Sequence, residues 1–399
     1  MDCRAELDVL LAVPSAQSAC GMGIDMKRER ILKFTTPASI WQEAFPIGNG
    51  RLGAFVYGGT DGELLRINED TLWSGYPGDE QTGMTKDAID QARELAKQGR
   101  YREADALLKE SNKGVRDVQI YEPFGDLVLT FEKEREITAY ERSLDLDTAC
   151  VNVTYRDRDN AFEETCFASA PAQEICLRIC AEKPFTVKIS AENGFLTEQR
   201  YETDGFALFG RLPGKSLRTV GSGKGEVESF VFSEIPEEMG MRYEGRGRVR
   251  TAGGTTEAQA DGLVCKDVLE LEIFLAVRSS YAGADRHPET EGADTAALLE
   301  TDLHGSERSF EVLKQEHIAE YQELFNRVEL ELPESGREQL DLRERILQYE
   351  KDPDDTALES LVFDFGRYLL ISCSRPGTQA ANLQGIWNCD RIPAWKSDY

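Results

Sequence analysis

From about residue 118 to residue 280, apolar and polar residues alternate with a period of two, the pattern of strands with one buried face. Turn residues separate the runs, and no helical pattern lies between them. Many strands without alternating helices favour a large antiparallel β-sandwich over a parallel sheet. The predicted strands are residues 127–131, 150–155, 174–181, 185–190, 206–209, 229–233 and 269–277.

Helical periodicity flanks this region on both sides. Residues 85–112 place alanines and leucines on one face, and Thr85 is a suitable N-cap. After the strands, helices are predicted at residues 295–303 and 310–328. His317 lies on the apolar face of the second of these, where we expect a packed, hydrogen-bonded histidine rather than a catalytic one.

A further helix at residues 354–373 leads into an amide-rich loop. The second half of this helix is apolar nearly all round, so we expect the helix to be buried. In the loop, Asn382, Gln384 and Asn388 offer hydrogen-bond donors and acceptors, and Trp387 offers an aromatic face. These groups suit a pyranose ring, although amides in such a loop could instead cap neighbouring helix ends.

The stretch from residue 41 to residue 79 carries too many glycines for a helix and contains short β-type runs at 52–57 and 63–67. An amide, carboxylates, hydroxyls and an indole follow within seven residues, beginning at Asn68 and including Trp73. Sugar sites combine polar side chains that grip hydroxyls with an indole that covers the apolar ring face. The alternative interpretation is a tight β-hairpin loop with a packed tryptophan.

Composition excludes several classes of function. The 399 residues suffice for two or more domains, and the net charge of −27 disfavours partners such as nucleic acid or a membrane surface. Nine cysteines without a CxxC pair and only three histidines favour free thiols in a cytoplasmic protein, with neither a metal site nor a cofactor. Cys176 and Cys180 lie about 13 Å apart on one predicted strand, too far apart for a disulfide.

Residues 1–25 differ from the rest of the chain. They contain a short apolar run, but acidic residues replace the positive segment of a signal peptide. We expect a disordered extension ahead of a natural start at Met26. The alternative is a lipoprotein-type signal ending at Cys20, which would make the protein secreted or membrane-anchored.

Several longer motifs resemble glycoside hydrolase family 95, the family of inverting α-L-fucosidases. The most specific are EAFPIGNGRLGAFVYGG and NEDTLWSG near the start, and FGRYLLISCSRPGTQAANLQGIWN and PAWKSDY near the end. The resemblance implies a mainly β fold: an N-terminal antiparallel β-supersandwich, then a helical linker and the first helix of an incomplete (α/α)6 barrel. The implied parts are an extension (1–25), the β-domain (26–280), the linker (281–350) and the start of the barrel (351–399).

The resemblance also implies an activity. Family members hydrolyse terminal α-1,2-L-fucosyl linkages of glycans, so the expected partner is a fucosylated oligosaccharide. The family's catalytic glutamate and aspartate fall beyond Tyr399, so no catalytic residue is assigned in this chain. Substrate contacts are expected from Asn382, Trp387, Gln384, Asn388, Trp73 and Asn68. The alternatives are an α-L-galactosidase or related specificity, or a non-catalytic carbohydrate-binding β-domain.

Overall fold

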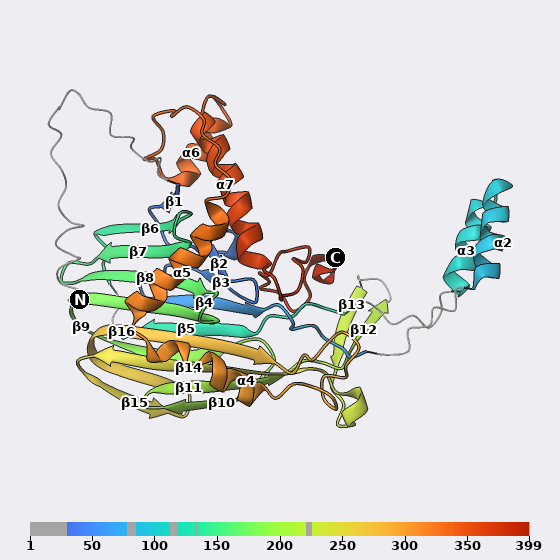
Figure 1. Ribbon diagram of the computed structural model, residues 1–399, viewed down its shortest axis with the longest axis horizontal. Coiled ribbons are helices and arrows are strands. Elements are labelled where there is room, and N and C mark those ends of the chain that lie inside the picture. The colour runs from blue at the N-terminus through green and yellow to red at the C-terminus, as the bar shows by residue number, and fades with distance from the viewer. Residues whose placement is uncertain (1–29, 78–84, 112–118, 133–134, 221–225, 399) are drawn as a thin grey trace.

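The computed structural model describes residues 30–77, 85–111, 119–132, 135–220 and 226–398. Its N-terminal region is a 14-stranded antiparallel sheet folded into two layers, followed by helices, as predicted (Figure 1). The expected extension, residues 1–25, lies outside the described residues. None of the described helices is long and apolar enough to cross a membrane.

One layer follows the strand order β1-β6-β7-β8-β9-β16-β14-β11-β10. Its members are β1 (Ile31–Phe34), β6 (Ala139–Asp145), β7 (Cys150–Arg156), β8 (Ala161–Ser169), β9 (Glu174–Glu192), β10 (Leu196–Glu202), β11 (Gly205–Arg211), β14 (Arg242–Ala252) and β16 (Gly262–Ser279). The second layer holds β2 (Phe45–Gly48), β3 (Leu52–Val56), β4 (Gly62–Glu69) and β5 (Gly125–Phe131). β15 (Thr255–Gln259) pairs with β16, and β12 (Lys215–Val220) with β13 (Glu226–Val231).

One long strand, β9, pairs with strands of both layers. The first half of β9 pairs with β8, from Phe162↔Ala181 to Ser169↔Glu174. Its second half pairs with β5, from Asp126↔Glu192 to Phe131↔Val187, while β16 follows its other edge. Each layer turns its apolar residues inward, so one continuous core fills the sandwich.

Glu63 is a charged group inside this sandwich. It is the second residue of β4, is 1% exposed, and accepts backbone N–H bonds of 3.0–3.1 Å from Tyr57, Gly58, Gly59 and Leu64. Burial raises the pKa of Glu63 to about 7 against the lowering effect of those four donors. Glu164 lies beside it, and burial followed by the Glu63 charge raises the pKa of Glu164 well above its ordinary value.

The helices largely follow the predictions. α2 (Lys86–Lys97) and α3 (Tyr101–Ser111) pack on each other, and Thr85 caps α2 by accepting from the Ala88 N–H. Gly99, at a φ of +77°, breaks the predicted single segment in two. α4 (Thr295–Asp302) lies against β14 and β16, and α5 (Phe310–Phe325) lies against β8 (Figure 1). α6 (Leu342–Tyr349), which the pattern did not predict, comes between α5 and α7.

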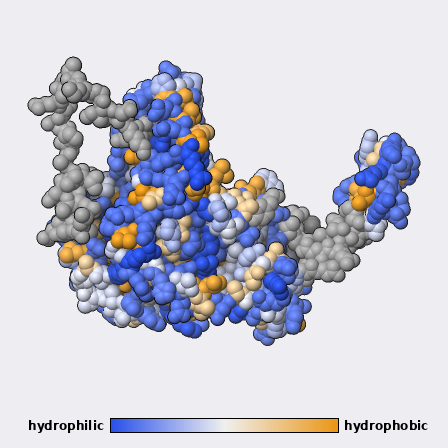
Figure 2. Space-filling view, viewed as in Figure 1, coloured by the Kyte–Doolittle hydropathy of each residue, from blue (hydrophilic) through white to orange (hydrophobic). Residues whose placement is uncertain are grey.

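α7 (Thr356–Cys373) is buried on one side only. Leu361 and Tyr368 face the sheet, and the Tyr368 hydroxyl donates to the Pro46 carbonyl over 2.5 Å. Val362 and Leu370, on the other side, are 63% and 65% exposed. The prediction of a buried helix therefore holds for one side of α7 only, because neighbours cover that side of its apolar surface and leave the other open (Figure 2).

His317 is packed, as predicted. It is 3% exposed, its ring stacks on Phe167 at 4.8 Å, and Nε2 lies 3.0 Å from the Thr148 carbonyl. That carbonyl can only accept, so Nε2 carries the proton, while Nδ1 has no hydrogen-bond partner among the residues that the structure describes. Burial lowers the pKa of His317 to about 4.

We therefore expect acid to weaken the fold through His317. As pH falls from about 6.5 to about 4, His317 of the unfolded chain takes up a proton and His317 of the folded protein does not. The free energy of unfolding therefore falls by about 3 kcal/mol over this range. His317→Gln can still donate to Thr148 and does not titrate, so its stability should fall less over this range. Urea denaturation of both proteins at pH 7 and pH 4.5 tests this; parallel losses would contradict it.

Candidate functional site

The C-terminal loop, residues 374–388, lies against the β2–β3 hairpin and the end of β4. Glycines in the hairpin allow this approach. A Cβ on Gly48 would lie 2.5 Å from the Ser372 carbonyl oxygen, and one on Gly53 would lie 2.7 Å from the Ile386 side chain. The Gly50 N–H donates to the Ser372 carbonyl over 2.8 Å. The glycine-rich stretch singled out from the sequence is thus a docking surface for the end of α7 and for the loop that follows it.

Asn68 and Asn388 bind each other reciprocally. The Asn68 Nδ2 donates to the Asn388 carbonyl at 2.9 Å, and the Asn388 N–H donates to the Asn68 Oδ1 at 3.0 Å. The Asn388 Nδ2 also donates to the carbonyls of Tyr121 and Asp390, both at 2.8 Å. Both side chains are at most 2% exposed, so they join the end of β4 to the loop in a water-free setting.

Trp387 makes the second attachment. It is 7% exposed, and its indole N–H donates to the Ile47 carbonyl of β2 over 2.8 Å. Next to it, the Tyr121 hydroxyl donates to the Ile386 carbonyl over 2.8 Å. Ile386 and Trp387 pack with Phe55 and Tyr57 in a separate apolar cluster on the outside of β3.

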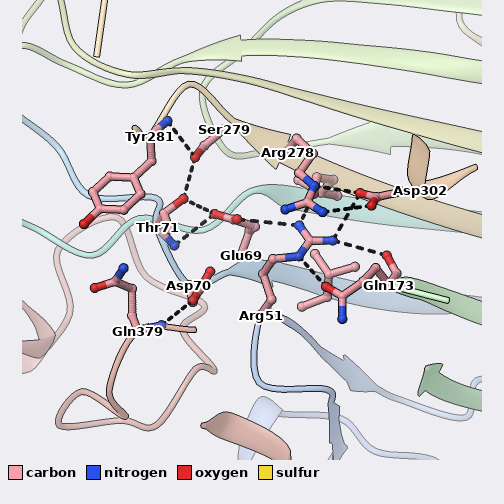
Figure 3. A network of polar contacts seen from close by, with 12 residues as sticks. Arg51, Glu69, Asp70, Thr71, Gln173, Arg278, Ser279, Tyr281, Asp302 and Gln379 are labelled. Carbon is pink, nitrogen blue, oxygen red and sulfur yellow. Dashed lines mark hydrogen bonds and ion pairs between the residues drawn. The ribbon is translucent and has the colours of Figure 1, made fainter. Parts of the chain in front are cut away.

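A buried polar network borders the loop (Figure 3). The Arg51 Nε donates to the Gln173 side chain at 2.6 Å, and its Nη atoms pair with Glu69 at 3.6 Å and with Asp302 at 3.5 Å. Arg278 holds the same Asp302 through two bonds of 2.7 and 2.8 Å. Burial lowers the pKa of Arg51, an effect that the charges of Glu69 and Asp302 oppose.

Asp70 connects this network to the loop. Its Oδ2 accepts the Gln379 N–H over 2.7 Å, while its buried Oδ1 has no hydrogen-bond partner in the described part of the chain. Burial, and then the adjacent Glu69 charge, raise the pKa of Asp70 to about 8. At neutral pH Asp70 is therefore mostly a neutral acid, able to donate a hydrogen bond from a site next to the loop.

The structure brings four of the six predicted contact residues, Asn68, Trp73, Trp387 and Asn388, to the junction where the C-terminal loop meets the sandwich. Most of their polar atoms already bind groups of the protein. The polar atoms of Asn68, Asn388 and Trp387 are bound within the protein, so a sugar could reach them only by displacing these bonds. The Trp73 indole donates to the Asp70 carbonyl at 3.2 Å and lies 5.2 Å from the Tyr121 ring.

The other two residues form the tip of the loop. The Asn382 side chain accepts from the Gln384 N–H at 2.9 Å, and the Gln384 side chain binds the Ser397 hydroxyl. Both are partly exposed. Direct substrate contact by any of the six stays a prediction. Sequence reasoning missed the Arg51 network, because no local pattern connects its members, which are Arg51, Glu69, Gln173, Arg278 and Asp302.

Two family profiles match this chain. Residues 32–284 match "Glycosyl hydrolase family 65, N-terminal domain", and residues 309–399 match "Glycosyl hydrolase family 95 catalytic domain". The chain belongs to glycoside hydrolase family 95. The first match covers the sandwich, and the second begins within the predicted linker and takes in α5, α6, α7 and the loop. The division at residues 281–350 and 351–399 stays a prediction.

Curated proteins similar to this family 95 chain include "Alpha-L-fucosidase 2" of Arabidopsis thaliana, 35% identical over 396 residues. That alignment covers 94% of this chain and 45% of the plant protein. "Probable alpha-fucosidase A" of Aspergillus niger is 28% identical, with 98% of this chain and 49% of the fungal protein covered. The chain thus spans about half the length of the curated relatives that it matches.

Proposed function

We propose that this chain is the N-terminal portion of an inverting exo-α-L-fucosidase that hydrolyses terminal α-1,2-L-fucosyl linkages of glycans. The observation that carries the proposal is the 35% identity to a protein named an α-L-fucosidase, which runs through the sandwich, the helices and the loop. The junction supports it, since loop residues of the family 95 catalytic match are fixed on the β-domain by buried hydrogen bonds.

We also propose that the 399-residue chain is inactive by itself. Inversion requires an acid and a base about 6.5–9.5 Å apart on opposite sides of the scissile bond. The resemblance to family 95 puts both groups beyond Tyr399. At the junction, Glu69 and Asp302 are already bound to arginines or hydroxyls of the sandwich, which leaves them poorly suited to either role.

Fucose release from 2′-fucosyllactose tests both statements. We expect no turnover by the 399-residue chain, and turnover by a protein extended through the whole catalytic domain. An α-L-galactoside offered in parallel distinguishes the alternative specificity. Turnover by the shorter chain would place the catalytic groups within it, and inactivity of the extended protein on both substrates would favour the carbohydrate-binding alternative.

The cytoplasm is the proposed location. Seven cysteines of the described part of the chain are in the thiol form, without a disulfide, and six of them are buried. Such thiols suit a reducing compartment. Fractionation of the source cells checks this, and recovery of the protein outside the cytoplasm would favour the secreted or lipoprotein alternative.

A further inference from the structure

The outer face of the sandwich carries a groove far along the sheet from the C-terminal loop. It has a volume of about 330 Å³ and runs over β10, β11 and β14 beside the end of α4 at Leu303. Gly205 and Ala207 of β11 form its floor, while the alternate residues Phe206 and Leu208 are buried in the core. Small residues on the middle strand therefore leave a trough between the side chains of the two outer strands.

Arginines line both sides of this trough. Arg200 of β10 and Arg246 of β14 both pair with Ala207, so they face each other across it, two strand spacings or about 10 Å apart. In the next row, Gly205 separates Glu202 from Arg248. Three guanidinium groups thus converge on one opening in a protein whose net charge is −27.

Two of these arginines are held in place by bonds from Nε, while their Nη atoms make no hydrogen bond to any described residue. Arg200 donates through Nε to Glu198 at 2.7 Å and lies over the Phe209 ring at 4.8 Å. Arg246 donates through Nε to Glu244, also at 2.7 Å. Neither makes another hydrogen bond within the described part of the chain, so their Nη groups are oriented for a ligand.

Arg248 is free. It forms no hydrogen bond or ion pair with any residue that the structure describes, and it is only partly exposed. A half-buried guanidinium without a partner is a donor set for an anion, because its planar fork matches the oxygens of a carboxylate or sulfate.

We propose that this groove binds the anionic group, a sulfate or a carboxylate, of an acidic oligosaccharide. The arginines receive the anion, and Glu202 and Asp204 at the rim accept hydrogen bonds from sugar hydroxyls. The same two carboxylates repel a dense polyanion, so the groove suits a sparsely charged ligand. The preference for a saccharide over an acidic peptide rests on the proposed glycosidase function; the recognition of an anion does not.

Binding to the 399-residue chain tests the proposal by calorimetry at low salt. The probes are 3′-sulfated lactose and 3′-sialyllactose, with lactose as their neutral parent and inorganic sulfate as the bare anion. We expect both acidic sugars to bind at least about tenfold more tightly than lactose and than sulfate. Arg248→Gln should weaken the acidic sugars about tenfold without changing the melting temperature, because Arg248 has no partner to lose.

Two further variants sharpen the result. Ala207→Leu fills the floor without changing charge and should also weaken binding, whereas Arg93→Gln, at an exposed arginine of α2, should not. If Arg248→Gln and the unchanged protein bound the acidic sugars with equal affinity, the proposed site would be wrong. If inorganic sulfate bound as tightly as the acidic sugars, the groove would recognise an anion but not a saccharide. Tighter binding of hexaglutamate would assign the groove to acidic peptides. Since no turnover is measured, failure of the fucosidase assay leaves these outcomes unaffected.

Discussion

Trp387→Ala is expected to lower the free energy of unfolding by about 3–5 kcal/mol, the usual loss for a large buried aromatic side chain. The substitution empties part of the cluster with Phe55 and Tyr57 and leaves the Ile47 carbonyl without its 2.8 Å donor. Because Trp387 and Asn388 both attach the loop to the sheet, we expect the loop to separate from the hairpin before the sandwich unfolds. Hydrogen exchange at the amide of Asn388, which bonds to Asn68 in the folded protein, reports that step.

Trp395→Ala is the matched control. This tryptophan lies eight residues further on and is 81% exposed, so its removal should change stability by less than about 0.5 kcal/mol. Urea denaturation followed by circular dichroism compares the two variants. If Trp387→Ala and Trp395→Ala denatured at the same urea concentration, the contacts of Trp387 with the sheet would not be what holds the loop.

Glu63→Ala should destabilise the sandwich by a similar or larger amount. The variant leaves four backbone N–H groups, those of Tyr57, Gly58, Gly59 and Leu64, without the carboxylate that accepts from them. The Tyr57 N–H also has the Leu64 carbonyl at 3.4 Å, so three of the four donors lose their only acceptor. An unsatisfied buried donor costs about 1–3 kcal/mol, so a total of about 3 kcal/mol or more is expected. Thermal unfolding provides the measurement.

Glu164→Gln provides the comparison for this change. The raised pKa of Glu164 keeps this carboxyl group protonated, and an amide reproduces the shape of a neutral carboxylic acid. The free energy of unfolding of Glu164→Gln should therefore fall by less than about 1 kcal/mol. A large loss of stability in Glu164→Gln together with a small loss in Glu63→Ala would show that Glu164, and not Glu63, carries the charge of the pair.

The sequence pattern could predict the sandwich because its inner residues alternate with a period of two. It divided β9 into two strands, at 174–181 and 185–190, because Lys183 and Pro184 resemble a turn. In the structure one strand of 19 residues passes through them. Pro184 falls in the interval between the β8 and β5 pairings, where no ladder bond needs its missing N–H.

The junction was harder to predict than the strands. The motifs around Asn68 and Asn388 marked the right segments, but the two residues are 320 positions apart, and no local pattern shows that they bind each other. Arg51 likewise finds Gln173 and Asp302 only after the sandwich closes. Which buried polar groups bind each other depends on the complete fold. A single sequence can therefore identify the candidate residues, but it cannot show which partners they bind.

The position of β9 between the two layers, with β16 along its other edge, has a consequence for synthesis on the ribosome. Until Ser279 has been made, the long edge of β9 has no β16 to pair with, although β5 and β8 are already present. At about 5–20 residues per second this unpaired edge persists for several seconds. A nascent chain stalled in that interval presents an open template to its neighbours, and this is the step at which a chaperone would most improve the yield.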